Sequence, residues 1–294
     1  MTIQQKSIPT NQRRPIGAIM GKLGVGKTTQ MVRAFPKWAF IKSDVSALDA
    51  AVDLIENDAE GAAALGLTES PPVQVDLIND NETSWIDWVE GFRAWVDGVM
   101  QARADAWQQL PKDKRKENKH LRLLLAGSSQ QLGIHIPEPG VPGVVITEAT
   151  TLWQWVTTSG QRSRGRGYDT NDAVSAALEE LMGVFQKWNL GLFFDGHVAE
   201  PVAERGYPRG FNWPFGRMRE TCARPLAIVW ELVMEAEDDS GEDVQYYFLT
   251  RAGYGPDNPL GTIRKTRRHG LPARLELNEK SMRDWLEEIR FRCD

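Results

Sequence analysis

The sequence predicts an α/β fold in which helices flank a mostly parallel sheet. Three observations support it: a glycine-rich turn between an apolar strand and a helix near the amino end, a strand–helix–strand unit in the second half, and a pair of strands near the carboxyl end. The chain has 294 residues and is 41% hydrophobic, which is enough for one large domain with a proper core. We expect a flexible tail over 1–14 and a single domain over 15–294, with an insertion at about 101–142.

Composition excludes several classes of protein. No stretch approaches the roughly 18 consecutive apolar residues of a membrane span, and the first residues, MTIQQKSIPTNQRR, lack the apolar segment of a signal peptide. The only cysteines, Cys222 and Cys293, have no CxxC spacing, which suits a reducing cytosol and gives no metal site. The net charge of −5 means that any nucleic-acid contact must come from local basic patches. We therefore expect a cytoplasmic protein.

The glycine-rich turn fits the pattern of a phosphate-binding P-loop. Residues 16–20 predict a strand, and residues 28–34 predict the first turns of a helix. Glycines let backbone N–H groups turn inward around phosphates, and the helix N-terminus favours negative charge. We expect Lys27 to reach the β- and γ-phosphates of a bound nucleotide and the Thr28 hydroxyl to bind Mg²⁺. The expected nucleotide-binding residues are Gly21, Lys22, Leu23, Gly24, Val25, Gly26, Lys27, Thr28 and Thr29.

Lys22 raises an alternative class. A lysine directly after the first glycine also occurs in partition and septum-site ATPases, whose next strand ends in an Asp-x-Asp-Pro-like switch. Here the next strand, residues 38–44, runs into VSALDAA without such a switch. We therefore expect Lys22 to be an ordinary exposed loop residue. The same strand places Asp44 at its carboxyl end, where ligands bind in open α/β sheets.

The middle of the chain predicts further helices and an insertion. Residues 47–66 predict a solvated helix, 71–78 a short strand, and 83–100 a helix with an apolar stripe. The insertion carries a basic run, PKDKRKENKHLR, and then a Gly/Pro-rich segment. We interpret the basic run as an exposed helix or loop, with a nucleic-acid contact as the alternative.

Two later strands compete to supply the carboxylate that holds magnesium. The strand that begins at residue 143 reaches Thr147 and then Glu148, whereas LGLFFDGH ends in Asp195-Gly196-His197. The amphipathic helix over 170–188 joins them as a parallel crossover unit. A hairpin over 226–250 and an amphipathic helix close the chain.

The order of these parts resembles that of the RecA-like P-loop ATPases of bacteriophages, which carry the label AAA domain and include recombination ATPases of the Sak type. The resemblance covers most of the chain outside the tail and the insertion. Beyond the P-loop it rests on five segments, which are GVVITEATTLW, GRGYDTND, LFFDGHVAEP, YPRG and GTIRKTRRHGLP. It implies a RecA-like fold with a C-terminal antiparallel hairpin, and a phage-encoded protein.

The resemblance also assigns residues 144–148 as the Walker B strand and 195–197 as the sensor strand. The family has an aspartate where this chain has Thr147. The Thr147 hydroxyl can still bind a magnesium-bound water, Glu148 can reach the site if the strand end shifts, and Asp44 can orient the attacking water. Slow or absent hydrolysis remains an open alternative.

Three further residues are expected to act on the γ-phosphate. His197 at a strand end would hydrogen-bond it and report its loss to the next loop. Lys265 and Arg267, in the segment where the family carries a Lys-x-Arg pattern, would reach the nucleotide of a neighbouring subunit. A solvated turn is the alternative for these two cations.

In RecA-like proteins the loops after these two strands grip single-stranded DNA, and here both are basic and aromatic. Arginines neutralise phosphates, and aromatic rings stack on bases. The predicted DNA contacts are Arg162, Arg164, Arg166, Tyr168, Arg205, Tyr207, Arg209, Trp213 and Arg217. The sequence thus predicts an ATPase that assembles as a ring or filament and acts on single-stranded DNA in recombination, annealing or replication. A small-molecule kinase and a nucleotide-binding scaffold are the alternatives.

Overall fold

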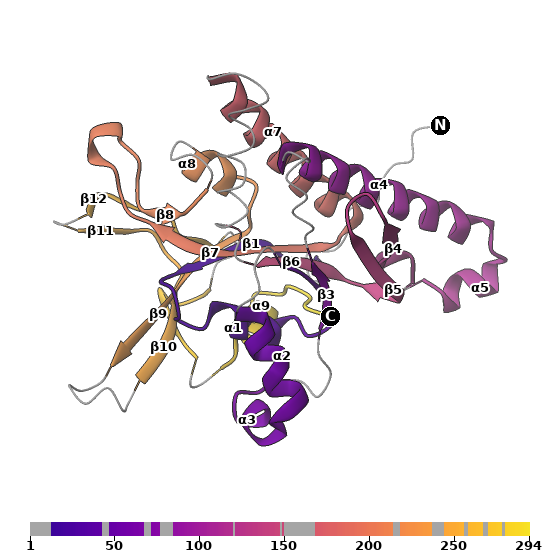
Figure 1. Cartoon of the computed structure of the whole chain (residues 1–294), viewed down its shortest axis with the longest axis horizontal. Helices are drawn as coiled ribbons and strands as arrows, with labels where there is room; N and C mark the ends of the chain where they lie inside the picture. Colours follow the sequence, from indigo (N-terminus) through magenta and orange to yellow (C-terminus); the bar gives the residue numbers. More distant parts are fainter. Residues whose placement is uncertain are drawn as a thin grey trace.

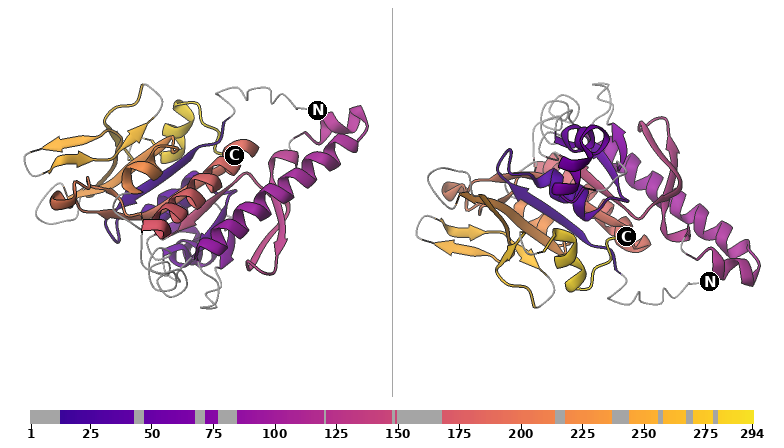
Figure 2. Two further views of the ribbon diagram at one scale, coloured as in Figure 1. Left: turned by 90° about the horizontal axis from the view of Figure 1, so that it is seen from above. Right: turned by 90° about the horizontal axis from the view of Figure 1, so that it is seen from below.

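The computed structural model describes most of the chain around one large sheet (Figures 1 and 2). The described residues are 13–42, 47–67, 72–76, 85–119, 121–147, 149, 168–213, 218–236, 244–255, 258–266, 270–277 and 280–294. The main path of the sheet has the strand order β14-β10-β9-β1-β7-β6-β2-β3, and β13 and β8 pair with β9 and β7 beside this path.

The central strands of the sheet are all parallel. All six residues of β1 are buried, as expected for a strand covered on both faces. The parallel strands are β1 (Ile16–Gly21), β2 (Ala39–Lys42), β3 (Val73–Asp76), β6 (Gly143–Thr147), β7 (Gly191–Ala199) and β9 (Ile228–Ala236).

Antiparallel strands extend the sheet beyond β9 and at the end of β7. These strands are β8 (Gly210–Phe211), β10 (Val244–Leu249), β13 (Lys265–Thr266) and β14 (Arg274–Glu276). A separate two-stranded sheet consists of β11 (Gly253–Gly255) and β12 (Asn258–Thr262). The predicted class is confirmed, because a mostly parallel sheet lies between helices and carries a C-terminal antiparallel hairpin.

Helices cover both faces of the sheet (Figure 1), and the sheet separates the hydrophobic core into two clusters. On one face pack α4 (Trp85–Gln109), α7 (Tyr168–Trp188) and α8 (Met218–Ala223). On the other pack α1 (Lys27–Ala34), α2 (Ala47–Asn57) and α9 (Met282–Glu288). Among the helices in the described part of the chain, none combines the length and apolarity needed to cross a membrane.

The predicted helix over 47–66 is interrupted. Asp58 accepts a hydrogen bond from the Gly61 N–H and begins a second helix, α3 (Ala59–Ala64). An aspartate accepting from the third following residue is a typical N-cap, which explains why α2 ends there. The remaining predicted helices and central strands are present, with boundaries that differ by a few residues except at the end of the helix predicted over 83–100.

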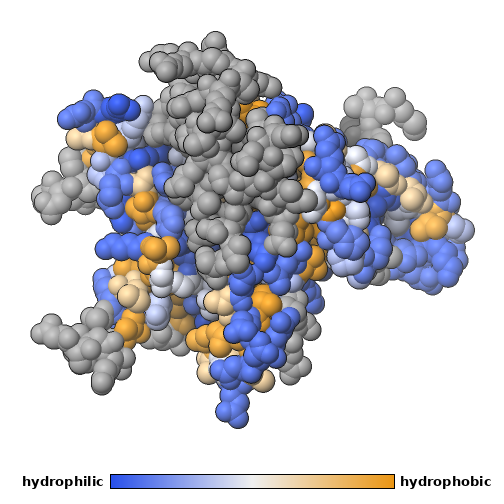
Figure 3. Space-filling model, in the orientation of Figure 1, coloured by the Kyte–Doolittle hydropathy of each residue, from blue (hydrophilic) through white to orange (hydrophobic). Residues whose placement is uncertain are grey.

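The region predicted as an insertion projects from the sheet (Figures 1 and 2). Helix α4 runs nine residues past its predicted end at 100, and α5 (Lys112–Glu117) follows at its far end with no buried residue. The basic run therefore forms an exposed helix over Lys112–Glu117, and this arm is mostly hydrophilic in Figure 3. Exposure fits both interpretations of the run, a solvated helix and a nucleic-acid contact. The chain returns through η2 (Leu121–Leu123) and the hairpin of β4 (Leu125–Ser129) and β5 (Ile134–Val141).

Both cysteines are free and buried. Burial raises the pKa of the Cys222 thiol to about 12 and that of the Cys293 thiol to about 12. Neither thiol therefore ionises near neutral pH, and neither is a reactive nucleophile.

The amino ends of β6 and β7 are packed against the ring of Trp38. A Cβ atom at Gly191 would lie 1.9 Å from Cη2 of Trp38, and one at Gly143 would lie 2.7 Å from Cδ2. The Trp38 indole also donates a hydrogen bond to the backbone carbonyl of Cys293, at 2.8 Å, so the ring has little freedom to move aside. Only glycine fits at residue 191.

We expect Gly191→Ala to lower the free energy of unfolding by about 1–3 kcal/mol, because the added methyl overpacks a fixed ring. Urea denaturation followed by circular dichroism measures this. The matched control is Gly183→Ala on the exposed side of α7, where a Cβ meets nothing within 4 Å. That variant is expected to gain about 0.5–1 kcal/mol from helix propensity. Equal changes in the free energy of unfolding for Gly191→Ala and Gly183→Ala would contradict the close packing of Gly191 against Trp38.

Candidate nucleotide-binding site

The turn after β1 has the backbone geometry of a phosphate-binding loop. Gly24 and Gly26 have φ angles of +76° and +86°, in the left-handed region that favours glycine. Gly26 is the N-cap of α1 and gives it no side-chain cap. The N–H groups of the first helical turn therefore remain available to an anion, at the positive end of the helix dipole.

Close packing explains the glycine at the start of the loop. A Cβ at Gly21 would lie 2.8 Å from the carbonyl oxygen of Leu232 and 2.9 Å from Cγ1 of Val25. Lys27 is 4% exposed, and its Nζ donates a hydrogen bond to the carbonyl of Lys22, at 3.1 Å. The ammonium thus lies within the loop that would surround the phosphates, whereas the Lys22 side chain is exposed, as predicted.

Thr28, the next residue, is bonded to strand β7. Its Oγ1 donates to Oδ2 of Asp195 at 2.7 Å, and both residues are buried, at 3% and 0% exposed. The register pairs Ile19 with Asp195 and Gly21 with His197. Because side chains alternate along a strand, Asp195 and His197 lie on the same face of the sheet, and the Thr28 bond identifies it as the face covered by α1.

Thr147 ends strand β6, one strand further from the P-loop. It is 2% exposed, and its hydroxyl donates to the carbonyl of Ile41 on β2, at 3.2 Å. Ile146 pairs with Phe194, so Thr147 and Asp195 follow at corresponding positions of neighbouring strands. Glu148 and Asp44, the other predicted carboxylates, lie outside the described residues.

The loop after β7 folds back on the opposite face of the sheet. Its strand β8 pairs with the end of β7, and Trp213 is only 3% exposed. The Trp213 ring lies edge-on to Phe194 at 5.4 Å and 4.7 Å from Phe211. These contacts correct the predicted role of Trp213 in base stacking: in this conformation the ring is a packing group of the core.

Arg209, another predicted DNA contact, is held by a buried carboxylate. Its Nη1 lies 2.6 Å from Oε1 of Glu231, while Nε of Arg264 donates to Oε2 at 2.8 Å. Glu231 is 3% exposed and pairs with Met20 on β1. Arg209 therefore ties the loop to the strand beside the P-loop strand. The sequence analysis did not identify Glu231. An acidic residue within the apolar strand IVWELVM indicates a buried carboxylate that needs a charged partner.

The remaining predicted DNA contacts are only partly described. Arg205 is exposed in the short helix η3 (Ala203–Arg205), and Tyr207 is half-buried. Arg162, Arg164, Arg166, Arg217 and the side chain of Tyr168 lie outside the described residues.

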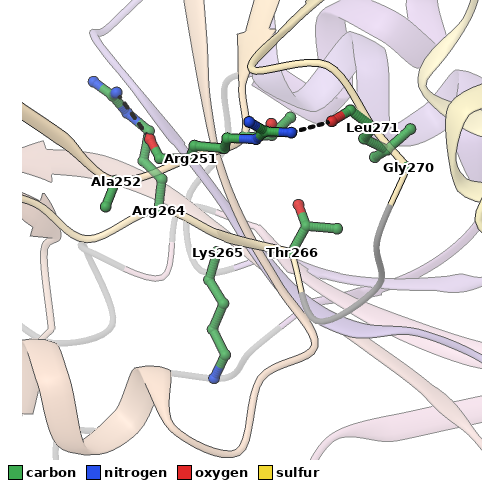
Figure 4. Close-up of a pocket in the computed structure, with 8 residues that line it drawn as sticks. Arg251, Ala252, Arg264, Lys265, Thr266, Gly270 and Leu271 are labelled. Carbon is green, nitrogen blue, oxygen red and sulfur yellow. Dashed lines mark hydrogen bonds between the residues drawn. The ribbon is translucent and has the colours of Figure 1, made fainter.

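Lys265, predicted to act on a neighbouring subunit, is bound within its own chain. Its Nζ donates to the carbonyls of Ala223 and Arg224, at 2.9 and 2.8 Å, at the end of α8. Figure 4 shows this side chain pointing away from Arg251 and Thr266, with which it lines a cavity of about 510 Å³. In this conformation Lys265 caps α8. Arg267 lies outside the described residues.

Many solved structures resemble this chain, and one example is an archaeal protein. The KaiC-like protein of the hyperthermophilic archaeon Pyrococcus horikoshii OT3 resembles this chain with a TM-score of 0.39 and 11% sequence identity, over 84% of this chain and 88% of that one. No protein-family model matches the chain. No curated protein sequence matches it either. The assignment of the site therefore rests on the strand order and on the geometry of the P-loop.

We expect Glu231→Gln to lower the free energy of unfolding by about 3 kcal/mol, because Arg264 would keep its charge without a carboxylate partner and Arg209 would keep only the exposed Glu200. The side chains of Arg209 and Arg264 are only 19% and 12% exposed. The matched control is Glu288→Gln, which breaks an ion pair with Lys280 in which both side chains are 45% exposed. It should cost less than about 1 kcal/mol. If urea denaturation shows similarly small losses of unfolding free energy for Glu231→Gln and Glu288→Gln, a structural role for Glu231 is contradicted.

Proposed function

We propose that the protein is an ATPase that binds ATP with Mg²⁺ and acts on single-stranded DNA. The observation that carries the nucleotide part is the loop between β1 and α1. Its two left-handed glycines, the first turn of α1 and the inward-facing Lys27 form a cradle for a triphosphate at the carboxyl end of a central parallel strand.

The residues of this cradle have distinct roles in the proposed reaction. The Lys27 ammonium would exchange the Lys22 carbonyl for phosphate oxygens and neutralise the charge that develops on the γ-phosphate. The Thr28 hydroxyl and the Asp195 carboxylate offer hard oxygen donors, which fit Mg²⁺. When bound, Mg²⁺ would supply charge neutralisation on the phosphates. His197, on the same face as Asp195, would contact the γ-phosphate and report its loss.

The DNA part rests on the loop that follows the sensor position. The N–H of Asn212 donates to the His197 carbonyl, so the loop after β7 is bonded directly to the residue proposed to sense the phosphate. Arg205 is exposed within this loop. We propose that Arg205 and the predicted arginines at 162, 164, 166 and 217 contact the DNA backbone, and that the chain assembles as a ring or filament with Arg267 acting across subunits.

The test is ATP hydrolysis by the full chain with and without single-stranded DNA. Stimulation supports the proposal, and the stimulated rate should fall as salt rises, because phosphate contacts release counterions. Transfer of phosphate to a nucleoside or nucleotide would instead favour a kinase, and binding without turnover would favour a scaffold.

We expect Lys27→Ala to weaken ATP binding about 10–100-fold, because a charge-assisted contact worth about 1.5–3 kcal/mol is lost. Equilibrium binding of a fluorescent ATP analogue measures this. The matched control is Lys22→Ala, which removes an exposed side chain but keeps the carbonyl that Lys27 contacts. Unchanged affinity in Lys27→Ala would overturn the proposal.

A further inference from the structure

We infer that Asp195 on β7, rather than a residue of β6, is the carboxylate of the magnesium site. This inference deepens the proposed function and rests on it. The carrying observation is the 2.7 Å hydrogen bond from Thr28 Oγ1 to Asp195 Oδ2, between two buried side chains that are 167 positions apart in the sequence.

The direction of this hydrogen bond matters for cation binding. A threonine hydroxyl that coordinates Mg²⁺ keeps its proton, and that proton needs an acceptor. Asp195 supplies the acceptor and leaves the oxygen lone pairs of Thr28 available to the ligand. Groups that orient a metal ligand in this way are known to tune the affinity of the site.

The position of Asp195 fits the same role electrostatically. It is 0% exposed and lies opposite Ile19 in the register, two residues before β1 ends, so its carboxyl group is close to the point at which the P-loop leaves the sheet. In the described part of the chain no group of three or more His, Cys, Asp or Glu residues could hold a metal ion. A site with few protein ligands is typical of Mg²⁺, which completes its shell with phosphate oxygens and water.

Strand β6 is less suited to the role. It is separated from β1 by β7, and its terminal residue Thr147 directs its hydroxyl proton to the Ile41 carbonyl on β2, away from β1. Asp195 on β7 is therefore nearer the P-loop than Thr147, which has the corresponding position on β6. The chain keeps a carboxylate beside Thr28 although Thr147 carries no charge.

The test compares nucleotide affinity with Mg²⁺ and with EDTA in the full chain, using a fluorescent ATP analogue. In the wild-type protein Mg²⁺ is expected to strengthen binding. In Asp195→Asn this enhancement should fall about 10–100-fold, while affinity in EDTA is retained. Asparagine has the same shape and can still accept the Thr28 hydrogen bond, so the charge is the only intended change.

Thr147→Val and Glu148→Gln test the competing residues at the end of β6, and the inference expects both to keep the enhancement by Mg²⁺. The matched control for the loss of a carboxylate charge is Glu288→Gln, which removes an exposed carboxylate of α9 and should also keep it. Circular dichroism checks that each variant folds, and Asp195→Thr replaces Asp195→Asn if the latter does not. Loss of the enhancement in Glu148→Gln with retention in the Asp195 variants would overturn the inference. Absence of nucleotide binding by the wild-type chain would instead overturn the proposed function, so the two failures are distinguishable.

Discussion

The parallel pairing of β1 with β7 is the constraint on which the site depends. Its register sets Asp195 opposite Ile19 and His197 opposite Gly21, so two polar side chains of β7 face the start of α1. The buried bond between Thr28 and Asp195 then joins the first turn of that helix to the sheet. A slip of one residue in this register would turn both side chains to the opposite face, towards α7.

The two faces of the sheet have different tasks. The face under α1 holds the P-loop and its polar partners, whereas the opposite face carries the loop after β7. Strands β7 and β9 flank β1, and the loop is joined to both of them. It is joined to β7 through β8, and to β9 through the ion pair between Arg209 and Glu231. A displacement of either neighbour of the P-loop strand would therefore be transmitted to the loop through bonds already present.

Local patterns made much of this structure predictable from the sequence. The P-loop could be recognised because its glycines, lysine and threonine are contiguous, and the long helices because their apolar residues repeat. The choice between the two candidate strands for the magnesium carboxylate stayed open, because both predicted strands ended in polar residues and the order of strands in a sheet is not a local property. The packing of Trp213 against Phe194 and the ion pair of Arg209 with Glu231 could not be predicted for the same reason. In each pair the partner lies on a strand that is not adjacent in sequence. The strand at Ile134 was missed among glycines and prolines, although Ile134 and Ile136 alternate with exposed residues.

If the loop binds phosphates as proposed, the internal contact of Lys27 would affect which anions it selects. Its ammonium already has the Lys22 carbonyl as a partner, so an entering anion gains only the difference between the two contacts. A small solute such as acetate gains little from that exchange. A polyphosphate meets the lysine and several backbone amides at once, and their combined contribution exceeds the loss. The loop would in this way discriminate against the common small anions of the cell without any steric gate.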